Sequence, residues 1–325
     1  MKKEKREFSL LADRPLKEGL LRIIDGLVQE AIDRIRQSGC EKSDDIHFVR
    51  VTIKRLRAIL HLYQPVIGVN AYTLNNARLG KAAHKLSSAR DVDVVEETLR
   101  TLINSDHMKK GSNGRIHFIG INNRSNIGID IGAVTDALES TVRSLHRARI
   151  SGTGWEAIEP GLTNVYRRSC QRMKKACTSG CDEAFHRWRI GAKQLYYGLE
   201  LLEPIAGTHI RRTISSLTKL QKKIGDDHDL MVLKETILAN RDAFGTSKEV
   251  KKILELIKKR SKKLRRAAIS LGETVLCEKP WHFVQQVWLQ WDEWSRGTPD
   301  LRVTSVKKLD RVSIFDGQSY SPTPA

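Results

Sequence analysis

The feature that most constrains this chain is a short motif that occurs twice, far apart in the sequence. The motif is a histidine, an arginine three residues later and a lysine four residues after that. Its two copies, 139 residues apart, are His47, Arg50, Lys54 and His186, Arg189, Lys193. An aspartate follows each copy, Asp91 44 residues after the first histidine and Asp229 43 residues after the second. Two ordered motifs recurring at nearly one offset predict a duplicated helical unit.

Both copies of the motif lie in segments with helical periodicity. On a helical wheel at about 100° per residue, the basic side chains of residues 46–63 form one stripe about 80° wide, opposite an apolar arc. This stripe contains His47, Arg50, Lys54, Arg57 and His61. In the second copy, a similar stripe contains His186, Arg189, Lys193 and Tyr197. A solvated charged face is the simpler interpretation. However, the first stripe contains no acid to relieve the repulsion between its cations, which favours an anionic ligand.

The rest of the chain also has the apolar spacing of helices, and no alternating strand pattern is evident. Further helices are expected at 16–37, 72–86, 91–103, 131–149, 162–178, 182–203, 209–224, 227–240, 249–270 and 281–294. The helix that follows Ser43 is expected to end near Pro65. These segments predict an all-α fold of two tandem four-helix units related by a pseudo-two-fold internal repeat, with a C-terminal helical extension.

The order of these segments gives a provisional division of the chain. Residues 1–15 form an N-terminal extension, and 16–130 form the first helical repeat with an inserted loop near 106–130. Residues 131–275 form the second repeat, and 276–325 contain a C-terminal helix and a loose tail. If the repeats pack about a two-fold axis, their basic stripes face one another, and an anion is needed between them.

Composition limits the class of partner. Lys and Arg total 57 against 38 acidic residues, a formal net charge of +19. Such an excess favours a polyanionic partner, and charge alone admits nucleic acid, an anionic membrane or a phosphate polymer. Aromatic residues make up only 6% of the chain, which is few for a protein that stacks bases. The five cysteines form no CxxC pair, so we expect free thiols in a reducing cytoplasm and neither a metal nor a cofactor. No run of 18 apolar residues predicts a membrane span.

The two motifs, the later aspartates and the segment YRRSCQRMKK at 166–175 resemble those of the CHAD domain family, the conserved histidine α-helical domains. The resemblance covers most of residues 10–275. It implies two four-helix units around a basic cavity that binds inorganic polyphosphate without catalysis. It also implies an association with polyphosphate-metabolising enzymes and, in some members, with polyphosphate granules. The two motifs carry the family's ligand-binding positions.

Other basic residues are candidates for the same phosphate-binding surface. Arg168, Arg172 and Lys175 share one predicted helix face, Lys81 and Lys85 share another, and Lys222 lies on the helix before Asp229. Each group alone is typical of a solvated face, but together with the stripes they predict a continuous basic rim. Arginine binds phosphate oxygens through its two-pronged guanidinium, and lysine supplies a mobile point charge.

The second repeat departs from the first at the far end of its stripe. Tyr196 stands where the first repeat has Arg57, and Glu200 stands where it has His61. We therefore expect weaker phosphate binding at that end of the second repeat. Asp91 and Asp229 are expected to begin helices and cap them, which is a structural role.

Two other functions remain open from the residues. The dipeptide His228-Asp229 is also found in all-α metal phosphohydrolases of the HD type, and His186 or His209 would supply another ligand. Against this, Arg90 occupies the position in the first repeat that corresponds to His228, and an arginine there would repel a metal ion. The alternative of a general RNA- or DNA-binding protein is compatible with the charge, although no RRM, KH or zinc-finger pattern supports it. A membrane-surface protein would need a basic amphipathic helix with an exposed bulky apolar face, which the sequence lacks.

Overall fold

The computed structural model describes residues 16–38, 43–86, 88–105, 130–149, 154–205 and 207–296. The predicted extension at 1–15, the inserted loop up to residue 129 and the tail after residue 296 lie outside this part of the chain. Within it, every regular element is a helix, as predicted. The α-helices are α2 (Leu16–Ser38), α3 (Ser43–Ile67), α4 (Val69–Lys85), α5 (Ser88–Ser105), α6 (Ile131–Arg147), α7 (Glu159–Ser179), α8 (Asp182–Leu201), α9 (Thr208–Ala239), α10 (Ser247–Val275) and α11 (Pro280–Arg296).

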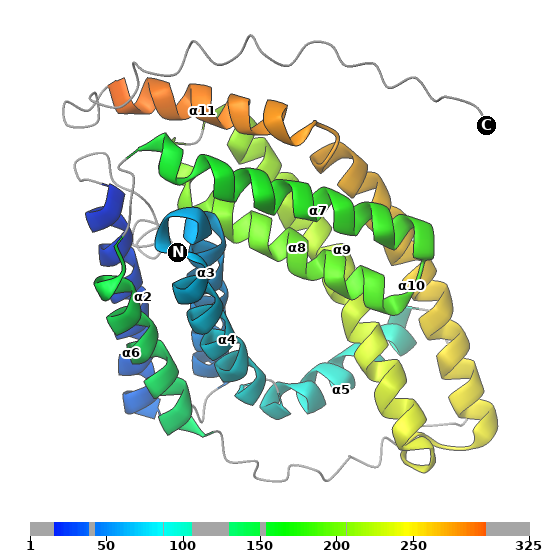
Figure 1. The fold of residues 1–325 in the computed structure, drawn as a ribbon. Coiled ribbons are helices and arrows are strands. Elements are labelled where there is room, and N and C mark those ends of the chain that lie inside the picture. The colour runs from blue at the N-terminus through cyan, green and yellow to red at the C-terminus, as the bar shows by residue number, and fades with distance from the viewer. Residues whose placement is uncertain are drawn as a thin grey trace, which may run out of the picture.

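The helices form two groups that share one core. Helices α2, α3, α4 and α6 pack together, and α7 to α10 form the second group with α11 lying against α7 (Figure 1). Helix α3 joins the two groups because it packs on α7 and α8 as well as on α2 and α4. Its buried residues belong to the same apolar cluster as those of α7 and α8.

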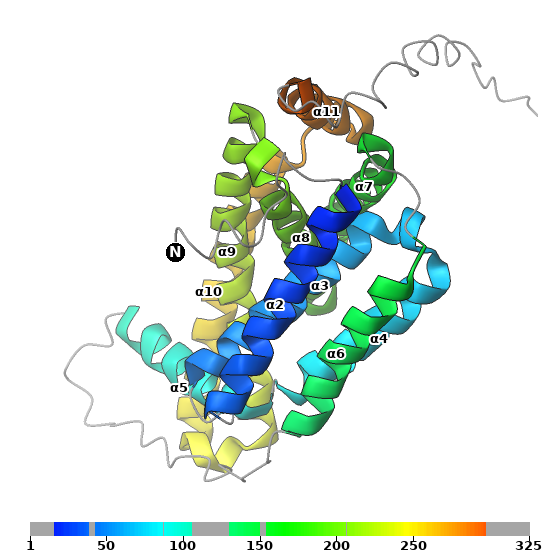
Figure 2. The same cartoon turned by 90° about the vertical axis from the view of Figure 1, so that its left-hand side faces the viewer.

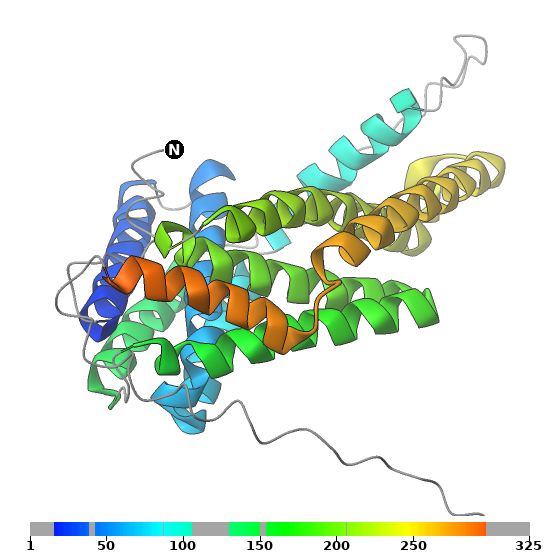
Figure 3. The same ribbon diagram turned by 90° about the horizontal axis from the view of Figure 1, so that it is seen from above.

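Packing crosses the boundary that the sequence suggested at residue 131. Helix α6 follows that boundary but packs against α2 and α4 of the first group (Figure 2). Helix α5 precedes the boundary but packs on α9 and α10 of the second group. A second apolar cluster forms there, in which Val95, Leu99 and Leu102 of α5 meet buried residues of α9 and α10. Seen from above, α9 and α10 extend side by side beyond the rest of the bundle (Figure 3).

A close crossing of α3 and α7 fixes the junction between the groups. A Cβ atom on Gly161 of α7 would lie 1.7 Å from the carbonyl oxygen of Leu62 on α3. Gly198 of α8 faces the side chain of Leu62, which is fully buried. Small residues at these two points let α7 and α8 approach α3 next to His61, the last residue of its basic stripe.

The structure corrects the prediction of two helices at 209–224 and 227–240. One continuous helix, α9, covers both segments. Gly225 keeps a negative φ and does not end the helix, because Ile224, Asp227 and Leu230 around it are buried. Asp229 therefore lies inside α9, and the predicted role of Asp229 as a helix cap is wrong.

Two other helix boundaries differ from expectation. Helix α5 begins at Ser88, so Asp91 lies within its first turn and is not its first residue. The side chain of Asp91 lies outside the described residues. Helix α3 continues through Pro65 to Ile67, one turn from its end, where loss of a single backbone donor is tolerated.

Candidate functional site

Cations from both repeats meet where α3 and α8 pack together and α9 lies beside α8. Lys193 of α8 interacts electrostatically with Arg189 on its own helix and with Lys54 and Arg50 on α3. Asp229 of α9 is the acid that opposes this charge at Lys193. The predicted convergence of the two motifs is therefore present at their arginine and lysine positions. We call these five residues the central cluster.

The central cluster is electrostatically unfavourable while no anion is present. Burial, followed by repulsion from Arg189, Lys54 and Arg50, lowers the pKa of Lys193 from its usual value to about 6. Asp229 acts in the opposite direction but does not restore the usual pKa. An anion bound beside Lys193 would favour the charged form of the amine and raise its pKa. The charged lysine would in turn attract the anion.

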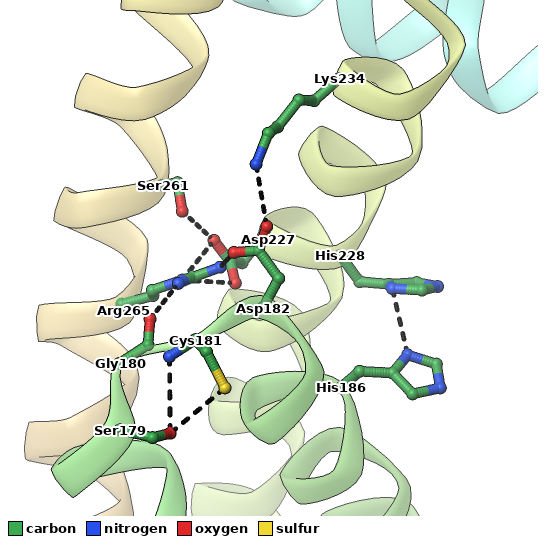
Figure 4. Close-up of polar contacts among 10 residues, drawn as sticks. All are labelled: Ser179, Gly180, Cys181, Asp182, His186, Asp227, His228, Lys234, Ser261 and Arg265. Atoms are coloured by element: carbon green, nitrogen blue, oxygen red, sulfur yellow. Dashed lines mark hydrogen bonds and ion pairs between the residues drawn. The ribbon is translucent and has the colours of Figure 1, made fainter. Parts of the chain in front are cut away.

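The histidine of the second motif pairs with the histidine of the HD dipeptide. The Nδ1 atoms of His186 on α8 and His228 on α9 lie 3.3 Å apart (Figure 4). Burial, then Arg189, His186 and Lys193, lowers the pKa of His228 to about 3, and burial also lowers the pKa of His186. Both imidazoles are therefore neutral at pH 7, and each is able to offer a ring N–H or a lone pair to a ligand.

The arginine of the first motif is oriented by the neighbouring helix. Arg50 Nη1 donates to the carbonyl oxygen of Leu86, 2.7 Å away, at the C-terminal end of α4. A cation at this position also satisfies the partial negative charge of a helix end. Arg50 is thus held at the edge of the central cluster by its hydrogen bond to α4.

A second group of cations surrounds the far end of the α3 stripe. His61 is buried, and its pKa is lowered to about 4 by burial and then by the nearby Arg57, Arg168 and Arg172. Arg57 on α3 donates to Asn76 on α4, and burial lowers the pKa of both Arg57 and Arg172. We call His61 with its three arginines the His61 cluster. It brings together predicted residues from α3 and α7.

The end of the second stripe carries an internal ion pair. Glu200 accepts from Arg55 Nε at 3.3 Å and from Arg55 Nη2 at 3.2 Å, and both side chains are largely buried. The carboxylate is therefore neutralised within the α3–α8 contact. Tyr197 lies near this pair and near Arg189, and burial, followed by Glu200, raises the pKa of Tyr197 to about 12. Weaker phosphate binding at this end stays a prediction, and the structure adds that the Glu200 carboxylate is already paired with Arg55.

The other predicted residues lie on exposed surface. These residues are His47, Lys81, Lys85, Lys175 and Lys222, whose side chains are all exposed. Lys85 forms an exposed ion pair with Asp130, which caps α6. Lys81 lines a shallow hollow on α4 with Lys85 and His84. Among the described residues, the interactions of the predicted cations form two compact clusters, and the continuous rim stays a prediction.

Sequence reasoning missed the uncharged side chains that connect these clusters. Gln194 lies next to Lys193 and bridges Arg172 to His61. Tyr72 of α4 contacts the other ring nitrogen of His61. No local pattern indicates either residue, since Gln194 and His61 are 133 positions apart. The sequence indicated His228 and His186 together only as possible metal ligands, and the direct contact between their rings was not predicted.

Within the described ranges, no group of three or more His, Cys, Asp or Glu side chains is arranged to hold a metal ion. Among the helices described, none is both long and apolar enough to span a bilayer.

Comparison with protein families adds an independent observation. The family model of the CHAD domain matches two consecutive segments, residues 23–125 and 127–238. The chain belongs to the CHAD domain family. The two matches divide the chain as the repeated motif does, with one copy of the motif in each. In this CHAD-domain protein, helix α10 and helix α11 follow the matched segments.

The CHAD fold is also found by comparison with solved structures. The crystal structure of the CHAD domain from the plant Ricinus communis matches with a TM-score of 0.61 and 17% sequence identity. The match covers 82% of this chain and 93% of the plant domain. At this identity the likeness concerns the fold alone. A search of curated protein sequences found no match.

Proposed function

We propose that this CHAD-domain protein binds inorganic polyphosphate, without catalysing a reaction on it, at the central cluster between its two repeats. The observation that carries the proposal is the environment of Lys193, where Arg50 and Lys54 of the first motif lie near Arg189 of the second. Arg50, Lys54 and Arg189 lie around Lys193, and Asp229 acts against their charge there, so the site has the charge of a receptor for an anion.

The kinds of side chain present favour phosphate over other anions. Polyphosphate is a flexible chain of charged groups without bases. Guanidinium groups bind its non-bridging oxygens through paired hydrogen bonds, and lysines add charge without demanding a fixed geometry. The neutral His186 and His228 supply further polar contacts beside the cations. The His61 cluster extends the basic surface to α7, so a chain of several phosphates has contacts at both clusters.

A nucleic acid is the principal competing ligand, and stacking distinguishes the two. Proteins that bind single strands without sequence preference place aromatic side chains beside their cations. The central cluster consists of arginine, lysine and aspartate, and Tyr197, which lies near Arg189, is largely buried with a raised pKa. A ligand without bases therefore suits this site better. Recruitment to polyphosphate granules or to polyphosphate-metabolising enzymes would follow from such binding.

The experiment is a calorimetric titration with phosphate, triphosphate and long-chain polyphosphate at two ionic strengths. We expect affinity to increase with chain length and to fall steeply with salt, because multiple contacts release counterions. Long-chain polyphosphate should displace single-stranded RNA at near-physiological salt. Retention of the RNA would contradict the proposal. Metal analysis of the purified protein tests the phosphohydrolase alternative, which stoichiometric Mn, Fe, Co or Zn would support.

A further inference from the structure

A cavity lies on the opposite side of α8 and α9 from the histidine pair. It has a volume of about 630 Å³, is open on one side, and is lined by the end of α7, the start of α8, and the facing sides of α9 and α10. Figure 4 shows His186 and His228 projecting away from α10, whereas Asp182, Asp227 and Arg265 lie between α8, α9 and α10. The volume is within the range of about 300–1,000 Å³ that is common for sites of small ligands. The cavity is separate from both clusters described above.

The floor of the cavity is apolar. Phe185, Leu230 and Ile257 are buried beneath it, and Leu254 and Leu238 border it. Leu238 is 41% exposed, so part of its side chain is accessible at the border of the cavity. A bare phosphate chain would gain nothing from such a surface, because its charges would lose water without receiving donors.

The inner wall of the cavity is a closed network of ion pairs. Arg265 donates to Asp227 at 2.9 Å and to Asp182 at 2.6 Å, and Lys234 donates to the same Asp182 at 3.0 Å (Figure 4). Ser261 also donates to Asp227. The guanidinium of Arg265 lies over the ring of Phe185. Both carboxylates are thus fully used, and the wall is held in place by contacts among α8, α9 and α10.

Three further cations stand at the mouth without such partners. Lys258, Lys262 and Arg266 line the cavity at successive turns of α10, spanning about 12 Å. All three are exposed, and none forms an ion pair with an acid of the described residues. The lining as a whole has five cationic side chains and two carboxylates, both of which are paired within the wall. The mouth therefore has unused positive charge above an apolar floor.

We propose that this cavity binds a monomeric amphiphilic anion, a molecule with one alkyl or acyl chain and a phosphate or carboxylate head. The chain occupies the apolar floor, and the head is held by Lys258, Lys262 and Arg266. A neutral lipid would leave the cations unused, and inorganic phosphate would leave the floor unused. A hollow of this size suits one molecule, and a flat exposed apolar face would be needed to lie on a bilayer.

Cys177 gives a direct test because this free thiol lines the cavity. The probe is decyl phosphate below its micelle concentration, with decanol and inorganic phosphate as probes that each lack one half of the ligand. We expect decyl phosphate to slow alkylation of Cys177 and to leave the exposed Cys277 unaffected, as followed by mass spectrometry. Neither decanol nor inorganic phosphate should protect Cys177 to the same extent. Equal protection of both thiols would overturn the proposal.

Charge-reversal variants locate the head group. The double variant Lys258→Glu/Lys262→Glu should weaken decyl phosphate binding about tenfold or more, since charge-assisted contacts are removed. Its matched control is Lys252→Glu/Lys263→Glu, which makes the same change of net charge on another face of α10. Leu238→Asp tests the floor at an exposed position where folding is not at risk. Circular dichroism establishes that each variant remains helical.

The outcomes separate this site from other ways of binding an amphiphile. Equal losses of affinity in both double variants would assign binding to net charge alone and overturn the proposal. Binding to vesicles of phosphatidylglycerol without any binding of monomeric decyl phosphate would also overturn it. Retention of polyphosphate binding by Lys258→Glu/Lys262→Glu would show that the cavity is independent of the central cluster.

Discussion

Gln194 Nε2 lies 2.7 Å from His61 Nε2, so an amide of the second repeat holds a buried histidine of the first. Arg172 Nη1 donates to the oxygen of the same amide at 3.1 Å. The amide nitrogen therefore donates to His61, and the proton of the imidazole lies on Nδ1, 3.0 Å from the hydroxyl of Tyr72. This chain of hydrogen bonds connects α7, α8, α3 and α4 and keeps His61 neutral among three arginines.

This network predicts an unusual titration of His61. Its pKa should be about 4, because burial and then Arg57, Arg168 and Arg172 disfavour the charged ring. Gln194→Glu places a carboxylate against the ring and should raise the pKa of His61 toward its usual value of about 6.5. Nitrogen-detected NMR across a pH series measures both. Gln285→Glu on α11 introduces the same charge elsewhere and should leave His61 unchanged. A wild-type His61 that titrates near 6.5 would contradict this account of the network.

Polyanion binding should be coupled to proton uptake at Lys193. With a pKa of about 6 this amine is uncharged at pH 7.5 in the free protein, beside Arg189, Lys54, Arg50 and Asp229. A bound anion favours the charged form and raises the pKa, so binding takes up a proton and affinity rises as pH falls from 8 to 6. Calorimetry with long-chain polyphosphate in two buffers of different ionisation enthalpy measures this uptake, since long chains have few titrating end groups.

The control for proton uptake is Lys193→Met, which should still bind through the remaining cations but take up fewer protons. Identical binding enthalpies of the wild-type protein in both buffers would refute the coupling while leaving polyphosphate binding itself intact. If the wild-type protein failed to bind long-chain polyphosphate at any pH, the proposed function itself would be refuted.

The residues explain why some of this site was predictable from sequence. The spacing of Arg50 and Lys54, and of Arg189 and Lys193, places each pair on one helix face, and the repetition of the motif indicates that the faces meet. The structure places the two pairs together around Lys193. The spacing of charged residues along one helix is a local pattern, and the helix face they share can therefore be predicted from the sequence alone.

Other parts depend on contacts that no local pattern contains. The sequence Gly225-Asp226-Asp227 is typical of a helix break. In the structure, however, Asp227 is buried and accepts hydrogen bonds from Ser261 and Arg265 of α10. That tertiary contact outweighs the local preference, and α9 continues. Glu200 likewise was assigned from its sequence position as an unfavourable charge in the groove, whereas Arg55, which sequence reasoning did not consider, neutralises it.

The ion pair of Glu200 should contribute to stability. Glu200→Gln leaves the largely buried Arg55 without its carboxylate, which should lower the free energy of unfolding by about 3 kcal/mol. Chemical denaturation monitored by circular dichroism gives the value. The matched control is Glu183→Gln, which removes an exposed ion pair with Arg187 and should cost less than about 0.5 kcal/mol. Equal effects of the two substitutions would contradict a buried role for Glu200.

The crossing of α3 and α7 should tolerate no side chain at Gly161. Gly161→Ala would force a Cβ against the backbone of Leu62 and should lower the free energy of unfolding by about 3 kcal/mol. Gly225→Ala is the control, because its Cβ would meet nothing within 4 Å. Within the continuous helix α9 it should stabilise the protein by up to about 1 kcal/mol. A destabilising effect of Gly225→Ala would indicate that α9 breaks there.

The most direct test of the central claim is the affinity of Arg50→Glu/Arg189→Glu for long-chain polyphosphate, measured by titration calorimetry. The claim predicts a loss of at least about a hundredfold, since two charge-assisted contacts become repulsions, while circular dichroism shows an intact helical fold. The control Lys248→Glu/Lys251→Glu reverses two exposed charges at the start of α10 and should bind nearly as the wild type does. Unchanged affinity in Arg50→Glu/Arg189→Glu, or equal losses in both variants, would contradict a shared phosphate site between the repeats.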